Sequence, residues 1–323
     1  MSILYIVIPC FNEEAVLPDS EAKLQNKLRT LISREIVSDS SRILFVDDGS
    51  KDRTWEIIAE LCSSDPHYNG VMLAHNKGHQ NALLAGLMVA KEHADIVVSM
   101  DADLQDDMDA IDSMIAKYHE GCDIVYGVRN KRVKDSFFKR FTAESFYKLM
   151  SMLGADTVYN HADYRLMSKR ALDSLAQYRE VNLFLRGIVP MLGYKTDCVY
   201  YERGERLAGE SKYPLKKMLA FAWEGITSLS TTPIKLITAG GGIVFLISLG
   251  MMIYSLIRHA IGATVAGWSS LIISLWMIGG LILLSIGVVG EYIGKIYLET
   301  KARPRYIIEK ELVSGEGTDE QTV

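Results

Sequence analysis

The sequence predicts an α/β domain with a doubly wound, mostly parallel sheet, followed by a pair of membrane-spanning helices. Three observations support this fold class. Short apolar runs alternate with helical stretches over residues 1–130, each apolar run ends in polar residues, and residues 234–290 are almost uncharged. Alternation of strands and helices is typical of a sheet that is covered by helices on both faces. The 323 residues are enough for one large domain or two modest ones.

Five apolar runs are predicted to be strands of the sheet. They are Ile3–Ile8, Arg42–Asp47, Gly70–Ala74, Asp95–Met100 and Asp123–Gly127. Their content of Ile, Val, Leu and Tyr is typical of strands that are buried on both faces. The periodic segments between them, at 14–34, 52–63, 77–92 and 107–119, are predicted helices. The domain then continues over a less regular region to residue 213, with a further strand near Thr196–Tyr201.

Polar residues follow each of the five predicted strands. They are Pro9–Glu13, Asp47–Ser50, His75–Gly78, Asp101–Asp103 and Val128–Arg129. In doubly wound sheets, ligands bind beyond the C-terminal ends of the strands. The topology alone therefore predicts one binding site at this edge of the sheet.

The acidic run that begins at Asp101 suggests a metal site. Asp101 and Asp103 follow a buried strand at a spacing that lets both carboxylates reach one hard cation, and Gln105 adds a neutral oxygen. Mg²⁺ and Mn²⁺ favour such ligands and keep positions open for phosphate oxygens. The alternative is a solvated acidic loop, since positions 106, 107 and 109 are also aspartate.

A second acidic turn, Asp47–Ser50, lies at another strand end. The Asp47 carboxylate can accept hydrogen bonds from a base or a ribose, and Gly49 permits a tight turn. The alternative is a plain turn that caps the next helix. The segment Pro9–Glu13 has the same two interpretations. Three such features at three strand ends favour a binding site over three unrelated turns.

Two uncharged segments, 236–257 and 268–290, are each close to the ~20 apolar residues that cross a bilayer. The loop between them is short, so the two spans should form a transmembrane hairpin within residues 234–290. Basic residues gather before the first span and after the second: Lys212, Lys216, Lys217, Lys235, Lys295, Lys301, Arg303 and Arg305. This distribution predicts that the domain and both termini lie in the cytoplasm.

Two further segments flank the predicted hairpin. Residues 214–233 form a juxtamembrane segment that can lie along the membrane surface, or can be an amphipathic helix packed on its own domain. Residues 291–323 form a cytoplasmic C-terminal segment. Its small, polar and acidic end after Leu312 is predicted to be disordered.

Composition argues against several other classes of protein. The net charge of −5 disfavours a general nucleic-acid binder. The four cysteines include no CxxC pair, so they offer neither a zinc site nor a disulfide framework and fit a reducing compartment. The apolar run at the N-terminus is too short and too lightly flanked for a signal peptide.

Taken together, the motifs resemble those of family 2 inverting glycosyltransferases with the GT-A fold. The motifs that carry this resemblance are Pro9-x-x-Asn12-Glu13, Asp47-Asp48-Gly49-Ser50 and Asp101-Ala102-Asp103-Leu104-Gln105-Asp106. Three later motifs are similar to the branch that contains dolichol-phosphate mannose synthases and bacterial polyprenyl-phosphate glycosyltransferases: His75–Leu83, Asp163–Leu166 and Arg206–Tyr213. The hairpin with its end Gly290–Lys295 resembles the glucosyltransferase subgroup of that branch. Asp107 departs from the family, which commonly has proline there.

The resemblance implies roles for individual residues. The nucleotide pocket would be lined by Pro9, Phe11, Glu13 and Asp47. Asp101 and Ala102 would also bind the donor. Asp101, Asp103 and Gln105 would hold Mg²⁺ or Mn²⁺ together with the donor diphosphate. Arg129 would face the donor or acceptor phosphates. We expect Asp101, Asp103 and Asp163 to be the catalytic residues.

Two of these assignments have a strong alternative. Arg206 and Lys212 would clamp the lipid phosphate and the donor diphosphate together, but they can also be juxtamembrane charges attracted to anionic lipids. Asp163 can orient the acceptor or the sugar, or form a structural ion pair with Arg165. The dispersed histidines, including His79, are predicted to be structural rather than metal ligands.

The implied activity is inverting transfer of a sugar from a nucleotide sugar to polyprenyl (undecaprenyl) phosphate at the cytoplasmic membrane face. Glucose from a UDP-linked donor is favoured, with N-acetylglucosamine or mannose as alternatives. A processive polysaccharide synthase is disfavoured because the sequence has no Gln-x-x-Arg-Trp pattern. A non-enzymatic membrane assembly or lipid-translocation subunit is the other alternative. Glycines in the hairpin could also permit contacts within a homo-oligomer.

Overall fold

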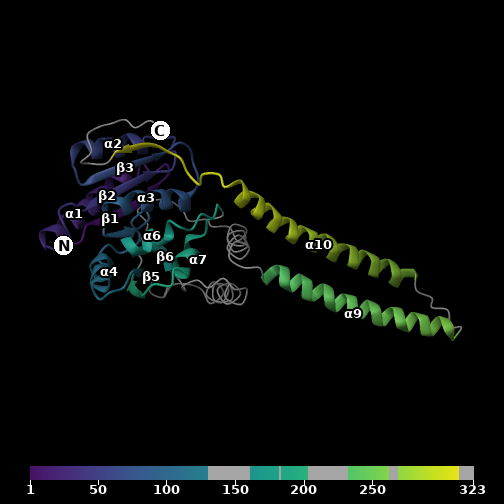
Figure 1. The fold of residues 1–323 in the computed structure, drawn as a ribbon. Coiled ribbons are helices and arrows are strands. Elements are labelled where there is room, and N and C mark those ends of the chain that lie inside the picture. The colour runs from purple at the N-terminus through teal and green to yellow at the C-terminus, as the bar shows by residue number, and fades with distance from the viewer. Residues whose placement is uncertain (130–160, 182, 203–231, 262–267, 313–323) are drawn as a thin grey trace. The chain divides into compact units, whose positions relative to one another are not determined.

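A computed structural model of the chain describes residues 1–129, 161–181, 183–202, 232–261 and 268–312 (Figure 1). The chain divides into two compact units. One contains the sheet and the helices packed on it, together with the residues from Arg303 onward. The other contains the two long helices α9 (Thr232–Ala260) and α10 (Trp268–Lys301).

The first unit is built on an eight-stranded sheet with the order β7-β5-β6-β4-β1-β2-β3-β8. The strands are β1 (Leu4–Cys10), β2 (Arg42–Asp47), β3 (Tyr68–Leu73), β4 (Ile96–Ser99), β5 (Ile124–Arg129), β6 (His161–Ser168), β7 (Thr196–Tyr201) and β8 (Ile308–Leu312). The pairings β1–β2, β1–β4, β2–β3 and β5–β7 are parallel, whereas β3–β8, β4–β6 and β5–β6 are antiparallel.

Helices cover both faces of this sheet, as the alternation of elements predicts. They are α1 (Leu17–Ser33), α2 (Thr54–Ser64), α3 (His79–His93), α4 (Ala110–His119), α6 (Lys169–Leu175) and α7 (Leu185–Met191). Side chains of α1, α2 and α4 pack in one hydrophobic cluster, and those of α3, α6 and α7 pack in another. In β1, Leu4, Ile6 and Ile8 belong to the first cluster, while Tyr5 and Val7 belong to the second. Successive residues of this strand therefore supply opposite faces.

The sequence located the first five strands within two residues of their observed ends, and the first four helices within three. It also placed β7, at Thr196–Tyr201. The expectation of a mostly parallel sheet needs correction, because the sheet is mixed. β6 enters between β4 and β5 and runs antiparallel to both, so these two strands, consecutive among the first five, are not neighbours.

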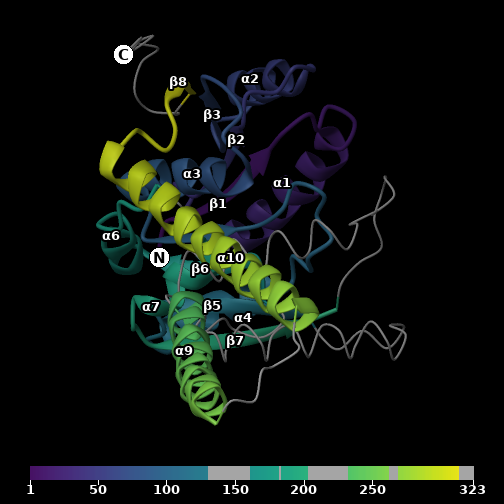
Figure 2. The ribbon, with the colours of Figure 1, turned by 90° about the vertical axis from the view of Figure 1, so that its right-hand side faces the viewer.

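The sequence analysis missed β8. Residues Ile308–Leu312 follow α10 and add an antiparallel strand to the free edge of β3, as Figure 2 shows. Their sequence, IEKEL, is charged and short, so its strand conformation comes from pairing rather than from an apolar run. The residues after Leu312 lie outside the described part of the chain, so the predicted disordered tail is not described.

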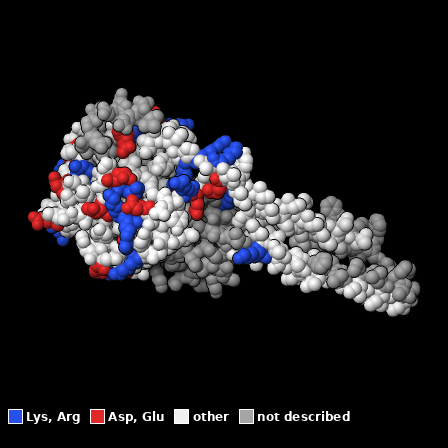
Figure 3. Space-filling view, in the orientation of Figure 1, with Lys and Arg blue, Asp and Glu red and all other residues white. Residues whose placement is uncertain are grey.

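The second unit presents apolar side chains to its surroundings. On α9 and α10 the exposed large apolar residues include Ile243, Leu246, Ile247, Leu271, Leu275, Leu283 and Leu284. The space-filling view shows few charged side chains along most of these helices, in contrast to the surface of the sheet unit (Figure 3). Among the described residues, one stretch, Met277–Lys301 of α10, is long and apolar enough to cross a membrane. The helix thus extends eleven residues beyond the predicted end at 290.

Candidate functional site

The C-terminal ends of β1, β2 and β4 meet at one edge of the sheet, because β1 pairs in parallel with both neighbours. A cavity of about 330 Å³ opens beside these ends. It is lined by Pro9, Cys10, Phe11, Glu13, Asp48, Asn76, Gly78, His79 and Ala82. Three of these residues, Pro9, Phe11 and Glu13, are predicted nucleotide-pocket residues. The strand-end argument therefore located a real hollow at the expected edge.

The far wall of the cavity is a turn, residues 75–78, that is held by the end of β2. The Asp48 carboxylate accepts hydrogen bonds from the backbone N–H of Lys77 at 2.7 Å and of Gly78 at 2.9 Å. Gly49 has φ of +66°, and a Cβ there would lie 2.7 Å from the backbone nitrogen of Asn76. Only glycine permits this close approach without strain.

Asp47 lies beside this turn but does not line the cavity. Its side chain is buried, and both carboxylate oxygens lie 3.3 Å from the backbone nitrogen of Ser50, which donates to them. Burial raises the pKa of Asp47. Within the described residues, Asp47 therefore closes its own turn, and a contact between Asp47 and a nucleotide remains a prediction.

Asp101 and Asp103 follow β4, and their charges act on the carboxyl group of Glu13. Burial raises the pKa of Glu13, and the charges of Asp103 and Asp101 raise it further. The pKa of Asp101 is also raised, first by burial, while His79 opposes the shift and neighbouring carboxylates add to it. Carboxylates whose pKa is raised by burial and by neighbouring carboxylates would be stabilised by a divalent cation.

The two predicted ligands, Asp101 and Asp103, would suit a cation that also takes ligands from its substrate. In the part of the chain that the structure describes, no group of three or more His, Cys, Asp or Glu side chains is arranged to hold a metal ion. Asp101 and Asp103 would therefore supply two carboxylates, and their role as metal ligands stays a prediction. Mg²⁺ is typically bound in this way, through one or two carboxylates together with phosphate oxygens and water.

The two predicted residues nearest these aspartates are buried. Ala102 is 5% exposed, and its carbonyl accepts a hydrogen bond from Ser20 Oγ at 2.7 Å. Gln105 is 3% exposed and donates its backbone N–H to Asp103 Oδ1 at 3.3 Å. The Gln105 Nε2 is buried without a hydrogen-bond partner among the described residues. Gln105 is therefore a polar side chain whose amide needs a partner in the functional state.

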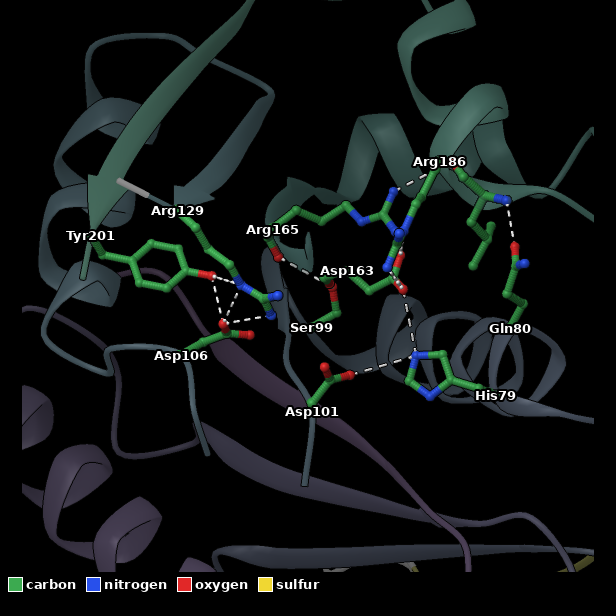
Figure 4. Close-up of polar contacts among 11 residues, drawn as sticks. His79, Gln80, Ser99, Asp101, Asp106, Arg129, Asp163, Arg165, Arg186 and Tyr201 are labelled. Atoms are coloured by element: carbon green, nitrogen blue, oxygen red, sulfur yellow. Dashed lines mark hydrogen bonds and ion pairs between the residues drawn. The ribbon is translucent and has the colours of Figure 1, made fainter. Parts of the chain in front are cut away.

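His79 lies between Asp101 and a second acidic residue, Asp163 (Figure 4). It is the first residue of α3, and its Nε2 lies 3.6 Å from Asp101 Oδ1 and 3.6 Å from Asp163 Oδ2. Burial alone would lower the pKa of His79, but the two carboxylates outweigh burial and raise it. The imidazole therefore bridges two carboxylates at the mouth of the cavity.

Asp163, on β6, is fixed by two arginines. Its Oδ1 accepts from Arg165 Nη2 at 2.8 Å, and Arg186 of α7 binds both oxygens, with Nη2 at 3.0 Å and Nε at 3.2 Å. Burial alone would raise the pKa of Asp163, but His79 and the two arginines hold it well below its usual range. The predicted ion pair with Arg165 is confirmed, and it is one part of a larger cluster.

Arg129, at the end of β5, is paired with the carboxylate of Asp106. Its Nη2 donates to Asp106 Oδ1 at 3.0 Å, and its Nε donates to Tyr201 Oη at 3.2 Å. Tyr201 in turn donates to Asp106 Oδ1 at 2.5 Å. Burial would lower the pKa of Arg129, but Asp106 and Tyr201 raise it instead. The predicted contact of Arg129 with phosphates would have to form in addition to these contacts.

Sequence reasoning assigned no role to several residues that the structure gathers here: Asp106, Arg186 and Tyr201. His79, inside the motif His75–Leu83, was predicted to be a structural residue and not a metal ligand, and its contacts with Asp101 and Asp163 are consistent with that prediction. Arg186 had no signal in the sequence, since α7 is short and follows a less regular region. Arg206 and Lys212 lie outside the described residues, as does most of the segment 214–233.

Comparisons with known proteins show the family of the chain. The sequence model of glycosyl transferase family 2 matches residues 5–176. The Bacillus subtilis (strain 168) protein named uncharacterized glycosyltransferase YkoT is 54% identical over 310 residues, covering 96% of this chain and 92% of that protein. The bactoprenol glucosyl transferase of Shigella phage SfV is 41% identical over 313 residues, covering 95% and 98%.

A solved structure that this chain matches is glucosyl-3-phosphoglycerate synthase from Mycobacterium tuberculosis, crystallised with Mn²⁺, uridine diphosphate and phosphoglyceric acid. It is 17% identical, with a TM-score of 0.46, and the match covers 71% of this chain and 77% of that chain.

Proposed function

We propose that this chain, which belongs to glycosyl transferase family 2, transfers glucose from a nucleotide sugar to polyprenyl phosphate at the cytoplasmic face of a membrane. The observation that carries the proposal is the near full-length identity of 41% to a bactoprenol glucosyl transferase. The match includes the region of α9 and α10, so it is not limited to the catalytic domain. N-acetylglucosamine or mannose on the same class of lipid is the alternative product.

The donor is proposed to bind at the cavity beside β1, β2 and β4. Pro9, Phe11 and Glu13 line this cavity, and the Phe11 side chain is 43% exposed, so it offers an apolar surface to a base. Asp47 is proposed to contact the nucleotide, and UDP is the favoured nucleotide. Asp101 and Ala102 are proposed to bind the donor beyond the nucleotide.

Asp101 and Asp103 are proposed to hold Mg²⁺ or Mn²⁺, with Gln105 as a third ligand through its amide oxygen. The ion would offset the negative charge that develops on the leaving nucleotide diphosphate. The raised pKa values of Glu13 and Asp101, caused by burial and by neighbouring carboxylates, support a cation at this place.

The remaining task of the protein is alignment, since an acceptor phosphate is anionic at neutral pH and needs little help from a general base. Asp163 suits this task, because a carboxylate bound by Arg165 and Arg186 with a lowered pKa is a poor base. It is proposed to position His79 and the groups around the sugar. In-line attack by the acceptor would invert the anomeric centre.

Further cations are proposed to bind the phosphates of the two substrates. Arg129 would face them from the end of β5, and Arg206 and Lys212 would clamp the lipid phosphate from the juxtamembrane stretch. Arginine suits this role because its planar guanidinium binds phosphate oxygens in pairs.

We propose that α9 and α10 form a transmembrane hairpin. β8 belongs to the same sheet as β3, although α9 and α10 separate the two strands in sequence. A chain that leaves this sheet before α9 and returns to it after α10 must cross a bilayer an even number of times. α9 has 29 residues, about 44 Å of helix, which exceeds the ~30 Å hydrocarbon core. Both termini would then be cytoplasmic.

Membranes that contain the protein, incubated with polyprenyl phosphate, a divalent cation and labelled UDP-glucose, should yield label that organic solvent extracts. The Asp103→Ala variant should lose at least about 100-fold of this activity, because the charge on the leaving group is no longer offset. The matched control is Asp19→Ala on the exposed surface of α1, which should keep full activity.

Two results would contradict the proposal. Label recovered in polymer or protein would refute the lipid acceptor. Full activity of Asp103→Ala would refute the metal assignment while leaving the acceptor unaffected. Replacing the donor by UDP-N-acetylglucosamine or GDP-mannose in the same assay would decide the sugar.

A further inference from the structure

We propose that the C-terminal strand β8 is part of the donor site: it fixes the turn of residues 75–78 that forms one wall of the cavity. The proposal rests on the proposed function only in assigning this cavity to the donor. The positioning of the turn itself follows from contacts between residues 307–312 and the end of β3.

The pairing of β8 with β3 extends to the residues that lead directly into the turn. Gly70 pairs with Leu312, Met72 with Lys310 and Leu73 with Ile308, with an irregularity in register between Met72 and Leu73. One residue later, the backbone N–H of Ala74 donates to the carbonyl of Ile307 at 3.0 Å. The strand contact therefore ends at the residue before His75.

The turn is then held from two sides. From β2, the Asp48 carboxylate binds the N–H groups of Lys77 and Gly78, and Gly49 packs against the backbone of Asn76. From the residue directly before β8, the Ile307 carbonyl fixes Ala74 at the other end of the turn. Asn76 and Gly78 line the cavity between these two points. Releasing either anchor would let this wall move.

Side chains of the same segment anchor it to the body of the domain. Tyr306 and Ile308 pack against the hydrophobic cluster that contains Val71 and Leu73. Arg305 Nη1 donates to the carbonyl of Tyr178 at 2.9 Å. The segment is thus bound at both ends and in its side chains, which is more than the covering of a free strand edge requires.

The connection between α10 and this segment is short. α10 ends at Lys301, and the first anchor, Arg305, follows four residues later. The segment that carries β8 therefore begins only a few residues after the helix with the membrane-crossing stretch. Binding of the donor should depend on β8 even though no β8 residue lines the cavity.

Adjacent isoleucines provide a matched test. Ile308 packs on the cluster, whereas the Ile307 side chain is 52% exposed and acts in the contact only through its backbone carbonyl. In the full-length protein, Ile308→Ser should loosen β8 and Ile307→Ser should not. Hydrogen exchange of the backbone amides from Ala74 to Gly78, followed by mass spectrometry, should be at least about tenfold faster in Ile308→Ser.

The kinetic consequence is specific to the donor. Ile308→Ser should raise KM for UDP-glucose about tenfold and leave KM for polyprenyl phosphate and the amount of protein in the membrane unchanged. A merely structural role would lower kcat through loss of folded protein without changing KM for the donor.

The failures of the two proposals can be told apart. Unchanged exchange at residues 74–78 in Ile308→Ser would overturn the positioning role, whatever sugar the protein transfers. Faster exchange with an unchanged KM for the donor would overturn the link to donor binding. If the wild type transfers no glucose to lipid, the proposed function fails, but the exchange result still tests the anchor.

Discussion

Two arginine–carboxylate clusters lie on either side of Asp101, and they differ in what they contact (Figure 4). The Asp106 cluster consists of Asp106, Arg129 and Tyr201, which are joined by hydrogen bonds to one another. The Asp163 cluster consists of Asp163, Arg165, Arg186 and His79, and through His79 it reaches the carboxylate of Asp101 at 3.6 Å.

From this difference we expect the Asp106 cluster to serve stability and the Asp163 cluster to align the groups of the proposed site. The Asp106 cluster ties the loop after β4 to the ends of β5 and β7, which are neighbouring parallel strands. The Asp163 cluster ties β6, α7 and the first residue of α3 to the residue proposed to bind the metal. If a single arginine–aspartate pair is considered, each cluster resembles a structural ion pair. The contacts of the whole cluster show that the Asp163 cluster reaches Asp101 through His79.

The largest expected effect distinguishes the clusters directly. Asp163→Asn and Asp106→Asn each leave a buried arginine without its charged partner, and each should cost about 3 kcal/mol of stability. Asp163→Asn should also lower kcat of the folded protein about 100-fold, because His79 and Arg186 lose their anchor. Asp106→Asn should lower kcat less than tenfold.

The measurement is thermal unfolding in detergent combined with lipid glycosylation per folded molecule. Equal losses of kcat in the two variants would remove the distinction between the clusters. A variant that fails to fold can be replaced by Asp163→Glu or Asp106→Glu, which keep the charge and test its placement alone.

The sequence could predict the half of the sheet that local patterns encode. β1 to β5 are apolar runs, and the residues after β1, β2 and β4 meet because parallel strands end at the same edge. β8 could not be predicted this way. Its residues Ile308–Leu312 carry three charges in five positions and form a strand because the edge of β3 accepts them.

The same distinction applies to the site. Asp101 and Glu13 follow strands and were found from the pattern. His79, Asp163 and Arg186 are far apart in sequence, and they meet because β6 enters beside β4 in antiparallel orientation. No local signal encodes that insertion, so the meeting of these three residues was not predicted.

His79→Asn should sharpen the comparison, since it removes the link between the Asp163 cluster and Asp101 while leaving both arginine contacts in place. We expect kcat to fall about 10- to 30-fold. Stability should change little, because the His79 side chain is 44% exposed. His119→Asn, at the exposed end of α4, is the matched control. Wild-type kcat in His79→Asn would show that the bridge is not needed.

The acid limit of stability should depend on Asp163. Its pKa is held well below the usual value in the folded protein, whereas the unfolded chain has a pKa near ~3.9. The unfolded state therefore binds the proton first as pH falls. The stabilisation is complete above pH ~4 and is lost as pH falls through the lowered folded value. The Tm of thermal unfolding, measured from pH 6 to pH 3, should fall less steeply in Asp163→Asn than in the wild type. Parallel curves of Tm against pH would contradict the dependence on Asp163.

The smallest expected effect tests whether the Asp106 cluster serves stability alone. Tyr201→Phe removes the hydroxyl that donates to Asp106 and accepts from Arg129, while the ring keeps its edge-on contact with Tyr164. Loss of one buried hydrogen-bonding group should cost about 1 kcal/mol, and Arg129 and Asp106 should remain paired. KM for both substrates and kcat should stay at wild-type values. A raised KM for either substrate would mean that Arg129 binds a phosphate and that Tyr201 orients its guanidinium group. The Asp106 cluster would then belong to the reacting site as well.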